Sequence, residues 1–353
     1  MLMLCGIVAG CSSDGSTGTF ASADATSAAS TAAPAVSVTP APPTTAAPTT
    51  PPTTPSPATT ANTPTTGPVR PATIAFSLPE GFGYPEGIAV DPATGRAYVT
   101  SNTTGAVAVA DPDDSAASVW LPAGSDGRGL TLGIEFDRDS VWIVSPPAIW
   151  EYGTDGALRG HHVAEGSAFL NDLAVTDAGV FVTDSFTPKL WFLPRGSAAD
   201  APLQLGLDMS AVSPLFADGI GLNGIEALPD GTLAAVHFAN GSLFHIDSAA
   251  GSVEAIDLGG ALLTVGDGMV LVGDDLWVTR GAAGDSIDRV TLCASYRCGT
   301  VVAGGQDPSL SFPTDVERRN DLLLVVNSQF DNGGGLGDGE PTLPFTVSAI
   351  AWK

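Results

Sequence analysis

The feature that most constrains this chain is a pattern that recurs six times after residue 72. Each unit opens with a short, mainly apolar segment of strand-like character. The first residues of successive segments are 46, 39, 52, 44 and 47 positions apart. The six segments are Glu86–Asp91, Leu132–Asp137, Asn171–Thr176, Asn223–Leu228, Asp267–Val272 and Thr314–Arg319.

A turn and a second apolar segment follow each opening, and third and fourth strands come after these. Turn sequences such as Pro229-Asp-Gly231 contain residues that tolerate tight turn geometry. A repeat of ~40 to 50 residues with four short strands is typical of a β-propeller blade. The second segments are Arg96–Thr100, Val141–Val144, Val180–Thr183, Thr232–Val236, Leu276–Thr279 and Leu322–Asn327.

Six openings predict six blades, so the predicted fold class is an all-β, six-bladed β-propeller over residues 73–353. The last unit ends at Thr346–Ala351 with only three strands. Ile74–Leu78 precedes the first opening and supplies the missing strand. Joining both ends of the domain in one sheet leaves only short, protected edges.

Composition agrees with an all-β domain and restricts its partners. The 353 residues include 42 Gly and 28 Pro, and 44% are hydrophobic but only 14% charged. The net charge of −25 repels nucleic acid and anionic lipid headgroups. We therefore expect a monomer that binds cations or a small-molecule substrate, and no nucleic acid. Because no run of ~20 apolar residues exists, we expect no transmembrane helix.

The N-terminal residues predict export and a lipid anchor. Residues 1–11 are apolar and end in Val8-Ala9-Gly10-Cys11, which resembles the lipobox of bacterial lipoproteins, with Cys11 as the lipidated residue. No Lys or Arg precedes this segment, as a signal peptide requires, so we expect the natural start to lie upstream. We thus predict an extracytoplasmic lipoprotein of the bacterial cell envelope that touches the membrane through its anchor alone.

Residues 12–72 are predicted to be a disordered linker. From Ala25 to Val69 the chain has no charged residue and consists almost entirely of Thr, Pro, Ala and Ser. Such a composition cannot bury enough apolar surface to offset the entropy of ordering. The linker would hold the propeller at a distance from the membrane, and its threonines are candidates for O-glycosylation.

Two of the four cysteines, Cys293 and Cys298, lie in the propeller. Four residues separate them, a spacing that suits a disulfide across the neck of a short hairpin. Zinc would need two more ligands, and no nearby His or Cys supplies them. A disulfide agrees with an oxidising compartment outside the cytoplasm.

The first residues of the six openings form the candidate site. In a propeller these positions converge at one mouth of the central channel, although a whole blade separates them in sequence. Carboxylate and amide oxygens from four blades make a hard-cation site of net charge about −2, which calcium fits best. Magnesium or manganese stays open, and zinc more often binds His or Cys. The four candidate ligands are Glu86, Asn171, Asn223 and Asp267.

An alternative is that Asn and Asp at strand starts only satisfy turn backbone groups and bind nothing. His237 ends the second strand of the fourth blade and is a weaker candidate for a substrate contact. His161 and His162 fall on a predicted outer strand, where a surface location is expected.

These motifs resemble the gluconolactonase family, which includes senescence marker protein (regucalcin) and, more distantly, the paraoxonases. The likeness covers nearly all of residues 73–353, and the matching motifs occur in the family's order of blades. They are Glu86-Gly87, Asn171-Asp172, Asn223-Gly224 and Asp267-Gly-Met269 with Asp275-Leu-Trp-Val278.

The resemblance implies one divalent ion bound by Glu86, Asn223 and Asp267, with Asn171 beside the metal or the substrate. In the family's lactone hydrolases the cation polarises the lactone carbonyl and a carboxylate activates water. Asp267 is then the candidate base, or a ligand only. Members that act on sugar lactones often have an arginine where this chain has Phe169. A less polar ester, lactone or wall-derived ligand is therefore as reasonable a substrate as an aldonolactone.

Two functions of different classes follow. The first, slightly favoured, is a metal-dependent hydrolase of lactones or esters. The second is a non-catalytic propeller, similar to NHL domains, that acts as a binding or scaffolding module of the cell envelope with a structural cation. Fold alone does not decide between them.

Overall fold

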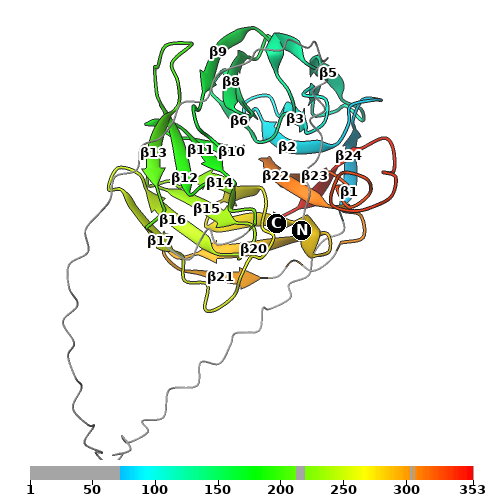
Figure 1. The fold of residues 1–353 in the computed structure, drawn as a ribbon. Coiled ribbons are helices and arrows are strands. Elements are labelled where there is room, and N and C mark those ends of the chain that lie inside the picture. Colours follow the sequence, from blue (N-terminus) through cyan, green and yellow to red (C-terminus); the bar gives the residue numbers. More distant parts are fainter. Residues whose placement is uncertain (1–71, 212–218, 303, 305–306, 353) are drawn as a thin grey trace, which may run out of the picture. The chain divides into compact units, whose positions relative to one another are not determined.

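The fold is described from a computed structural model that covers residues 72–211, 219–302, 304 and 307–352 (Figure 1). The predicted signal segment 1–11, its lipidation site Cys11 and the linker up to residue 71 lie outside the described residues. The first described strand, β1, starts at Thr73.

Six four-stranded antiparallel sheets make up the domain, as the repeat predicts, so the six-bladed β-propeller is confirmed (Figure 1). In the first five blades the strands pair in chain order. The first three blades consist of β2 (Pro85–Val90), β3 (Ala97–Ser101), β4 (Val107–Ala110) and β5 (Ser118–Leu121); β6 (Ile134–Asp137), β7 (Ser140–Ser145), β8 (Ala148–Gly153) and β9 (Leu158–Val163); and β10 (Leu170–Val175), β11 (Gly179–Asp184), β12 (Lys189–Pro194) and β13 (Gln204–Asp208).

The last three blades follow the same plan, except that the sixth takes its outer strand from the start of the domain. Their strands are β14 (Leu222–Ala227), β15 (Leu233–His237), β16 (Leu243–Asp247) and β17 (Ser252–Ala255); β18 (Met269–Val272), β19 (Asp275–Arg280), β20 (Ser286–Leu292) and β21 (Gly299–Val302); and β22 (Pro313–Arg319), β23 (Leu322–Asn327) and β24 (Thr346–Ala351) with β1 (Thr73–Ser77).

The ring closes through the pairing of β1 with β24, as the sequence predicts. Thr73 lies opposite Ala349, and Ser77 lies opposite Thr346. Phe76 of β1 is 1% exposed and packs in a core that joins the sixth blade to the first. The two ends of the domain are thus held by hydrogen bonds and by shared apolar burial.

Neighbouring blades are also joined by threonine hydroxyls near the channel. Thr100 of β3 donates to the Leu132 carbonyl at 2.6 Å, Thr183 of β11 to Asn223 at 2.8 Å, and Thr279 of β19 to Thr314 at 2.7 Å. Each acceptor is the first residue of the next blade's opening. Blades one, three and five are therefore fixed to blades two, four and six at the level of the candidate site.

Among the residues that the structure describes, helix is confined to two short 3₁₀ turns, η1 (Ser125–Gly127) and η2 (Gly281–Ala283). No helix in the described part of the chain is long and apolar enough to cross a membrane.

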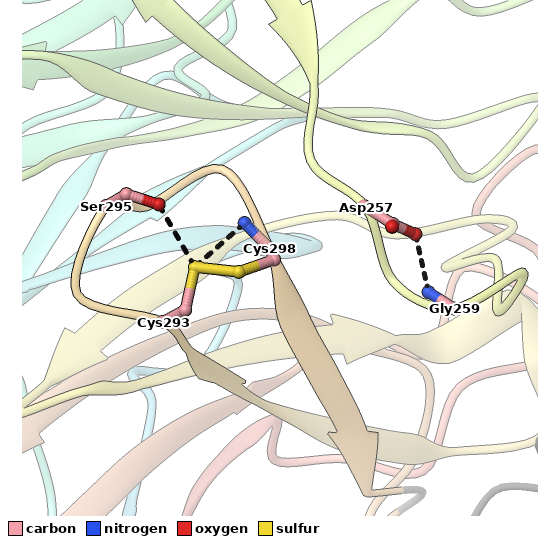
Figure 2. The surroundings of a disulfide bond; sticks show 5 residues. All are labelled: Asp257, Gly259, Cys293, Ser295 and Cys298. Atoms are coloured by element: carbon pink, nitrogen blue, oxygen red, sulfur yellow. Dashed lines mark hydrogen bonds between the residues drawn. A yellow bond between two sulfur atoms is a disulfide. The ribbon is translucent and has the colours of Figure 1, made fainter.

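The predicted disulfide joins Cys293 and Cys298 at the neck of the hairpin between β20 and β21 (Figure 2). Their Cα atoms are 5.4 Å apart. Asp257 docks beside this neck: its N–H donates to the Arg297 carbonyl, and its carbonyl accepts from the Gly299 N–H, both at 2.9 Å. The disulfide therefore stiffens a point where the fifth blade meets the connection from the fourth.

The closing strand offers a direct test of ring closure. We expect Phe76→Ala to lower the free energy of unfolding by about 3 to 5 kcal/mol, because it removes a buried ring from the junction of the two ends. Ile74→Ala, in the same strand but at a side chain 67% exposed, should change it by less than about 0.5 kcal/mol. Urea unfolding of both variants measures this difference. Equal effects would contradict the role of β1 in closure.

Candidate metal centre

The four predicted ligands line one cavity of about 10 Å³ at the channel mouth. This volume suits a single water molecule or ion. Gly133, Asp172, Gly268, Thr314 and Asp315 complete the lining. Of the six opening positions, the cavity takes five; Leu132 is instead buried in a blade core.

Four of the six strand starts at this mouth are irregular. The pairing of first and second strands shifts register between Pro85 and Ile88 in the first blade and between Pro313 and Val316 in the sixth. The third and fourth blades have the same irregularity at Leu170–Leu173 and Leu222–Ile225. A bulge of this kind turns a residue out of the regular ladder, and bulges are frequent beside functional sites.

Hydrogen bonds fix the orientation of the Asn171 amide. The Ser185 hydroxyl donates to the Leu222 carbonyl at 2.8 Å, so it accepts from Asn171 Nδ2 at 2.9 Å. This leaves Oδ1 as the remaining polar atom of a side chain that is 8% exposed. Oδ1 is buried and has no hydrogen-bond partner. Because buried polar atoms are normally satisfied, this oxygen is a suitable ligand for a cation or acceptor for a donor group.

The two carboxyl groups of the cavity, those of Glu86 and Asp267, are buried and interact electrostatically. Burial, and then the charge of Asp267, raises the pKa of Glu86 well above its ordinary value. Burial likewise raises the pKa of Asp267, with Asp172 adding to the rise and a hydrogen bond from Asn223 opposing it. A bound divalent cation would replace the proton that such a pair otherwise retains.

Two aspartates in the cavity lining, Asp172 and Asp315, join neighbouring blades. The sequence did not predict this role. Asp172 accepts the N–H of Leu173 at 2.8 Å and, across the blade boundary, that of Ile225 at 3.0 Å. Asp315 does the same with Val316 at 2.8 Å and Ile88 at 2.7 Å. They bind the third blade to the fourth and the sixth to the first.

A signal for this pair was present in the sequence. The second residue of the opening is Gly in four blades and Asp in the third and sixth, which are opposite in the ring. Close packing explains the contrast, because a Cβ on Gly133 would lie 2.2 Å from Asp172 Oδ1, and one on Gly268 would lie 2.0 Å from Asp315 Oδ1.

A second ring of carboxylates lies further along the channel. Glu135, Glu226 and Glu317 come from the fourth opening position of alternate blades and line a separate cavity of about 380 Å³. Burial raises the pKa of all three, that of Glu317 to about 7. Their spacing in every other blade was visible in the repeat, but its meaning depends on the closed ring.

The histidines are placed differently from the four ligands. His237 ends β15 and is 3% exposed, but it is not among the described residues that line the small cavity, and its Nδ1 accepts the Asn240 N–H at 3.3 Å. The expected surface location is correct for His161, which is exposed and stacks on Trp150. It is wrong for His162, which is 1% exposed because its Nδ1 binds the Ala201 carbonyl of the third blade at 2.8 Å.

Within the described residues, no three His, Cys, Asp or Glu side chains are grouped so that they alone could hold a metal ion. Any cation at this mouth would therefore depend on the two amides as well as on Glu86 and Asp267. The buried, unpaired Asn171 oxygen and the two buried carboxyl groups fit such a mixed set of oxygen ligands.

The six sheets define the class as a six-bladed β-propeller, and comparisons with solved structures find similar folds at low sequence identity. The chain matches virginiamycin B lyase from Staphylococcus aureus, solved as a catalytically inactive variant with quinupristin, at 13% identity and TM-score 0.54 over 79% of this chain and 98% of that one. It matches the PQQ-bound aldose sugar dehydrogenase from Streptomyces coelicolor at 13% identity and TM-score 0.55 over 82% and 99%.

A protein of unknown function from Bacteroides thetaiotaomicron matches at 13% identity and TM-score 0.59 over 80% of this chain and 75% of that one. Such low identities establish the fold and leave the activity open. No protein-family model and no curated protein sequence matches the chain, so membership of the gluconolactonase family stays a prediction.

The buried glutamates predict a pH-dependent stability in the absence of divalent cations. Because burial raises the pKa of Glu317 from 4.5 to about 7, the folded state holds this proton more tightly than the unfolded state. The resulting stabilisation is fully present below pH 4.5 and is lost as the pH rises through about 7. Glu317→Gln cannot ionise, so it should gain on the order of 3 kcal/mol relative to wild type between about pH 4 and pH 8.

Urea unfolding in EDTA at both pH values measures this gain, with Glu80→Gln at an exposed position as the control. A difference from wild type that is the same at both pH values would contradict the assigned direction of the pKa shift.

Proposed function

We propose that this propeller is a divalent-cation-dependent hydrolase of lactones or esters, with calcium as the preferred ion. The observation that carries the proposal is the buried Asn171 Oδ1, unpaired and fixed beside Glu86 and Asp267. The resemblance to gluconolactonases in the order of these motifs supports the same assignment. The neighbouring folds include a lyase and a dehydrogenase, so this architecture accommodates small-molecule chemistry in other proteins.

Glu86, Asn171, Asn223 and Asp267 would hold the ion. When bound, a divalent cation supplies a Lewis acid that polarises a carbonyl oxygen and lowers the pKa of water. The protein contributes rigidity: Ser185 fixes the Asn171 side-chain amide, and the Thr183 hydroxyl donates to the backbone carbonyl of Asn223 at 2.8 Å. The remaining carboxylates of the lining are occupied by backbone N–H groups, which keeps Asp172 and Asp315 in their places.

Asp267 is the proposed base. Its carboxylate lines the same small cavity as the other proposed ligands, so it lies at the site where it would take a proton from an attacking water. The Asn223 side chain hydrogen-bonds to this carboxylate and orients it. The proton can then pass to the leaving alkoxide, so the residue returns to its starting state.

The location is proposed from the N-terminal residues. The lipobox-like Val8–Cys11 and the Thr/Pro/Ala-rich linker would place the propeller outside the cytoplasm, and the Cys293–Cys298 disulfide suits that compartment.

A non-catalytic envelope module with a structural cation is the second candidate. It is favoured by the size of the cavity, about 10 Å³, which suits an ion with no substrate.

The stabilisation of wild type and of Asp267→Asn by calcium tests the proposed metal site. Calcium at ~100 times its Kd should stabilise wild type by about 2.7 kcal/mol, and this gain should disappear in Asp267→Asn. Without calcium the variant should be at least as stable as wild type at neutral pH, because it removes one of two repelling buried carboxylates. Asp274→Asn, at an exposed turn of the same blade, is the matched control. Thermal unfolding with and without calcium measures all three proteins.

Activity is measured on a panel of lactones and aryl esters. We expect turnover that is abolished by chelation and restored by calcium, with kcat reduced by about 10² to 10⁴ in Asp267→Asn. Calcium stabilisation without turnover on any substrate would favour the structural-cation module. No effect of any divalent cation on stability or turnover would reject both.

A further inference from the structure

An aromatic pair lies on the two segments that adjoin Asn171: Phe169 is two residues before it, and Phe186 follows Ser185, which accepts a hydrogen bond from the Asn171 amide. The rings of Phe169 and Phe186 have centroids 5.7 Å apart and are tilted by 58°. Phe169 precedes β10 and is half-buried against the core of the third blade. Phe186 follows β11 and is 49% exposed. A half-exposed phenylalanine supported by a second ring presents an apolar face to a ligand.

The pair is held rigidly through its backbone. Asp184 is fully buried, and its carboxylate accepts the N–H of Ala168 at 2.9 Å, of Phe169 at 3.0 Å and of Phe186 at 3.2 Å. One side chain therefore fixes both segments that carry the rings. The two rings are therefore in place before any ligand binds, which limits the conformational entropy lost on binding.

Hydrogen bonds connect the aromatic pair to Asn171, one of the proposed metal ligands. Ser185 lies between Asp184 and Phe186; its N–H donates to the Phe169 carbonyl at 2.9 Å, and its hydroxyl accepts from Asn171. The residue that orients the Asn171 amide is thus the residue that joins the two aromatic segments. A molecule with a polar group at Asn171 has the aromatic pair as its neighbour.

Exposed apolar side chains support an apolar surface at this end of the ring. Eight large hydrophobic side chains are exposed among the described residues, and four of them lie in outer strands. The other four lie in connections that, by strand register, emerge at the mouth with the metal centre. These are Phe186, Leu262, Leu336 and Leu343.

The negative charge at the mouth restricts the chemical class of the ligand further. Glu86 and Asp267 at the mouth, in a chain of net charge −25, disfavour an anionic ligand. Resting on the proposed function, we infer that Phe169 and Phe186 form a specificity wall for the apolar substituent of a neutral lactone or ester. Polyhydroxylated sugar lactones would leave their hydroxyl groups unpaired against these rings and would be poor substrates.

The experiment compares γ-decanolactone, γ-butyrolactone and glucono-δ-lactone on the calcium-loaded protein. Wild type should prefer γ-decanolactone to γ-butyrolactone by at least about tenfold in kcat/KM, because the hexyl chain is buried against the wall. Phe186→Ala should reduce this ratio about fivefold to tenfold. The truncation keeps the backbone N–H that Asp184 accepts, so folding is preserved. Leu205→Ala, 52% exposed in the outer strand β13 of the same blade, should keep the wild-type ratio.

A binding measurement separates this inference from the proposed activity. Saturation-transfer NMR with γ-decanolactone should show contact with the hexyl chain in wild type and at least a fivefold weaker signal in Phe186→Ala. If no lactone is hydrolysed but the saturation-transfer signal still differs between wild type and Phe186→Ala, the hydrolase proposal fails. The inference that the two rings bind the apolar substituent is then supported. Three results would each reject the inferred specificity wall. They are equal kcat/KM ratios in wild type and Phe186→Ala, a preference of wild type for glucono-δ-lactone, and no binding of γ-decanolactone to wild type.

Discussion

The pairing of β1 with β24 is the contact on which the rest of this structure depends. It places a strand that starts at Thr73 beside one that ends at Ala351, so residues from both ends of the domain share one sheet. Only in a closed ring do the openings of six blades point at one axis. The hydrogen bonds of Asp315 to Ile88 and of Asp172 to Ile225 then set the distance between blades beside the candidate centre.

Closure concentrates negative charge along the channel. Two layers of carboxylates face the axis, and burial raises the pKa of each of them. They are Glu86, Asp172, Asp267 and Asp315 near the mouth, and Glu135, Glu226 and Glu317 beyond it. An arrangement of this kind opposes stability at neutral pH unless protons or cations compensate it. Buried groups with such shifted pKa values are concentrated at functional sites, which supports the proposal of a cation site in the channel.

Much of the architecture could be predicted from the repeat because every blade obeys the same local rules. The turn after Asp91, the apolar second strands and the spare strand before Glu86 all follow from alternation and turn residues, and the structure confirms them. His162 was misplaced because strand patterning shows that a strand is outermost in its own blade. It does not show that residues 199–203 of the next blade cover it, as the bonds to His161 and His162 reveal.

The sequence by itself determined the number of blades, the closing strand, the disulfide and the four oxygen-bearing residues that meet at one cavity. These depend on periodicity and short spacing, which are properties of a linear chain. Only the tertiary structure decided that the Asn171 oxygen is left unpaired, that Asp172 and Asp315 join blades, and that the Phe186 ring packs against that of Phe169. The physical reason is that hydrogen-bond satisfaction, burial and charge repulsion are set by neighbours from other blades, on average ~45 residues away in the chain.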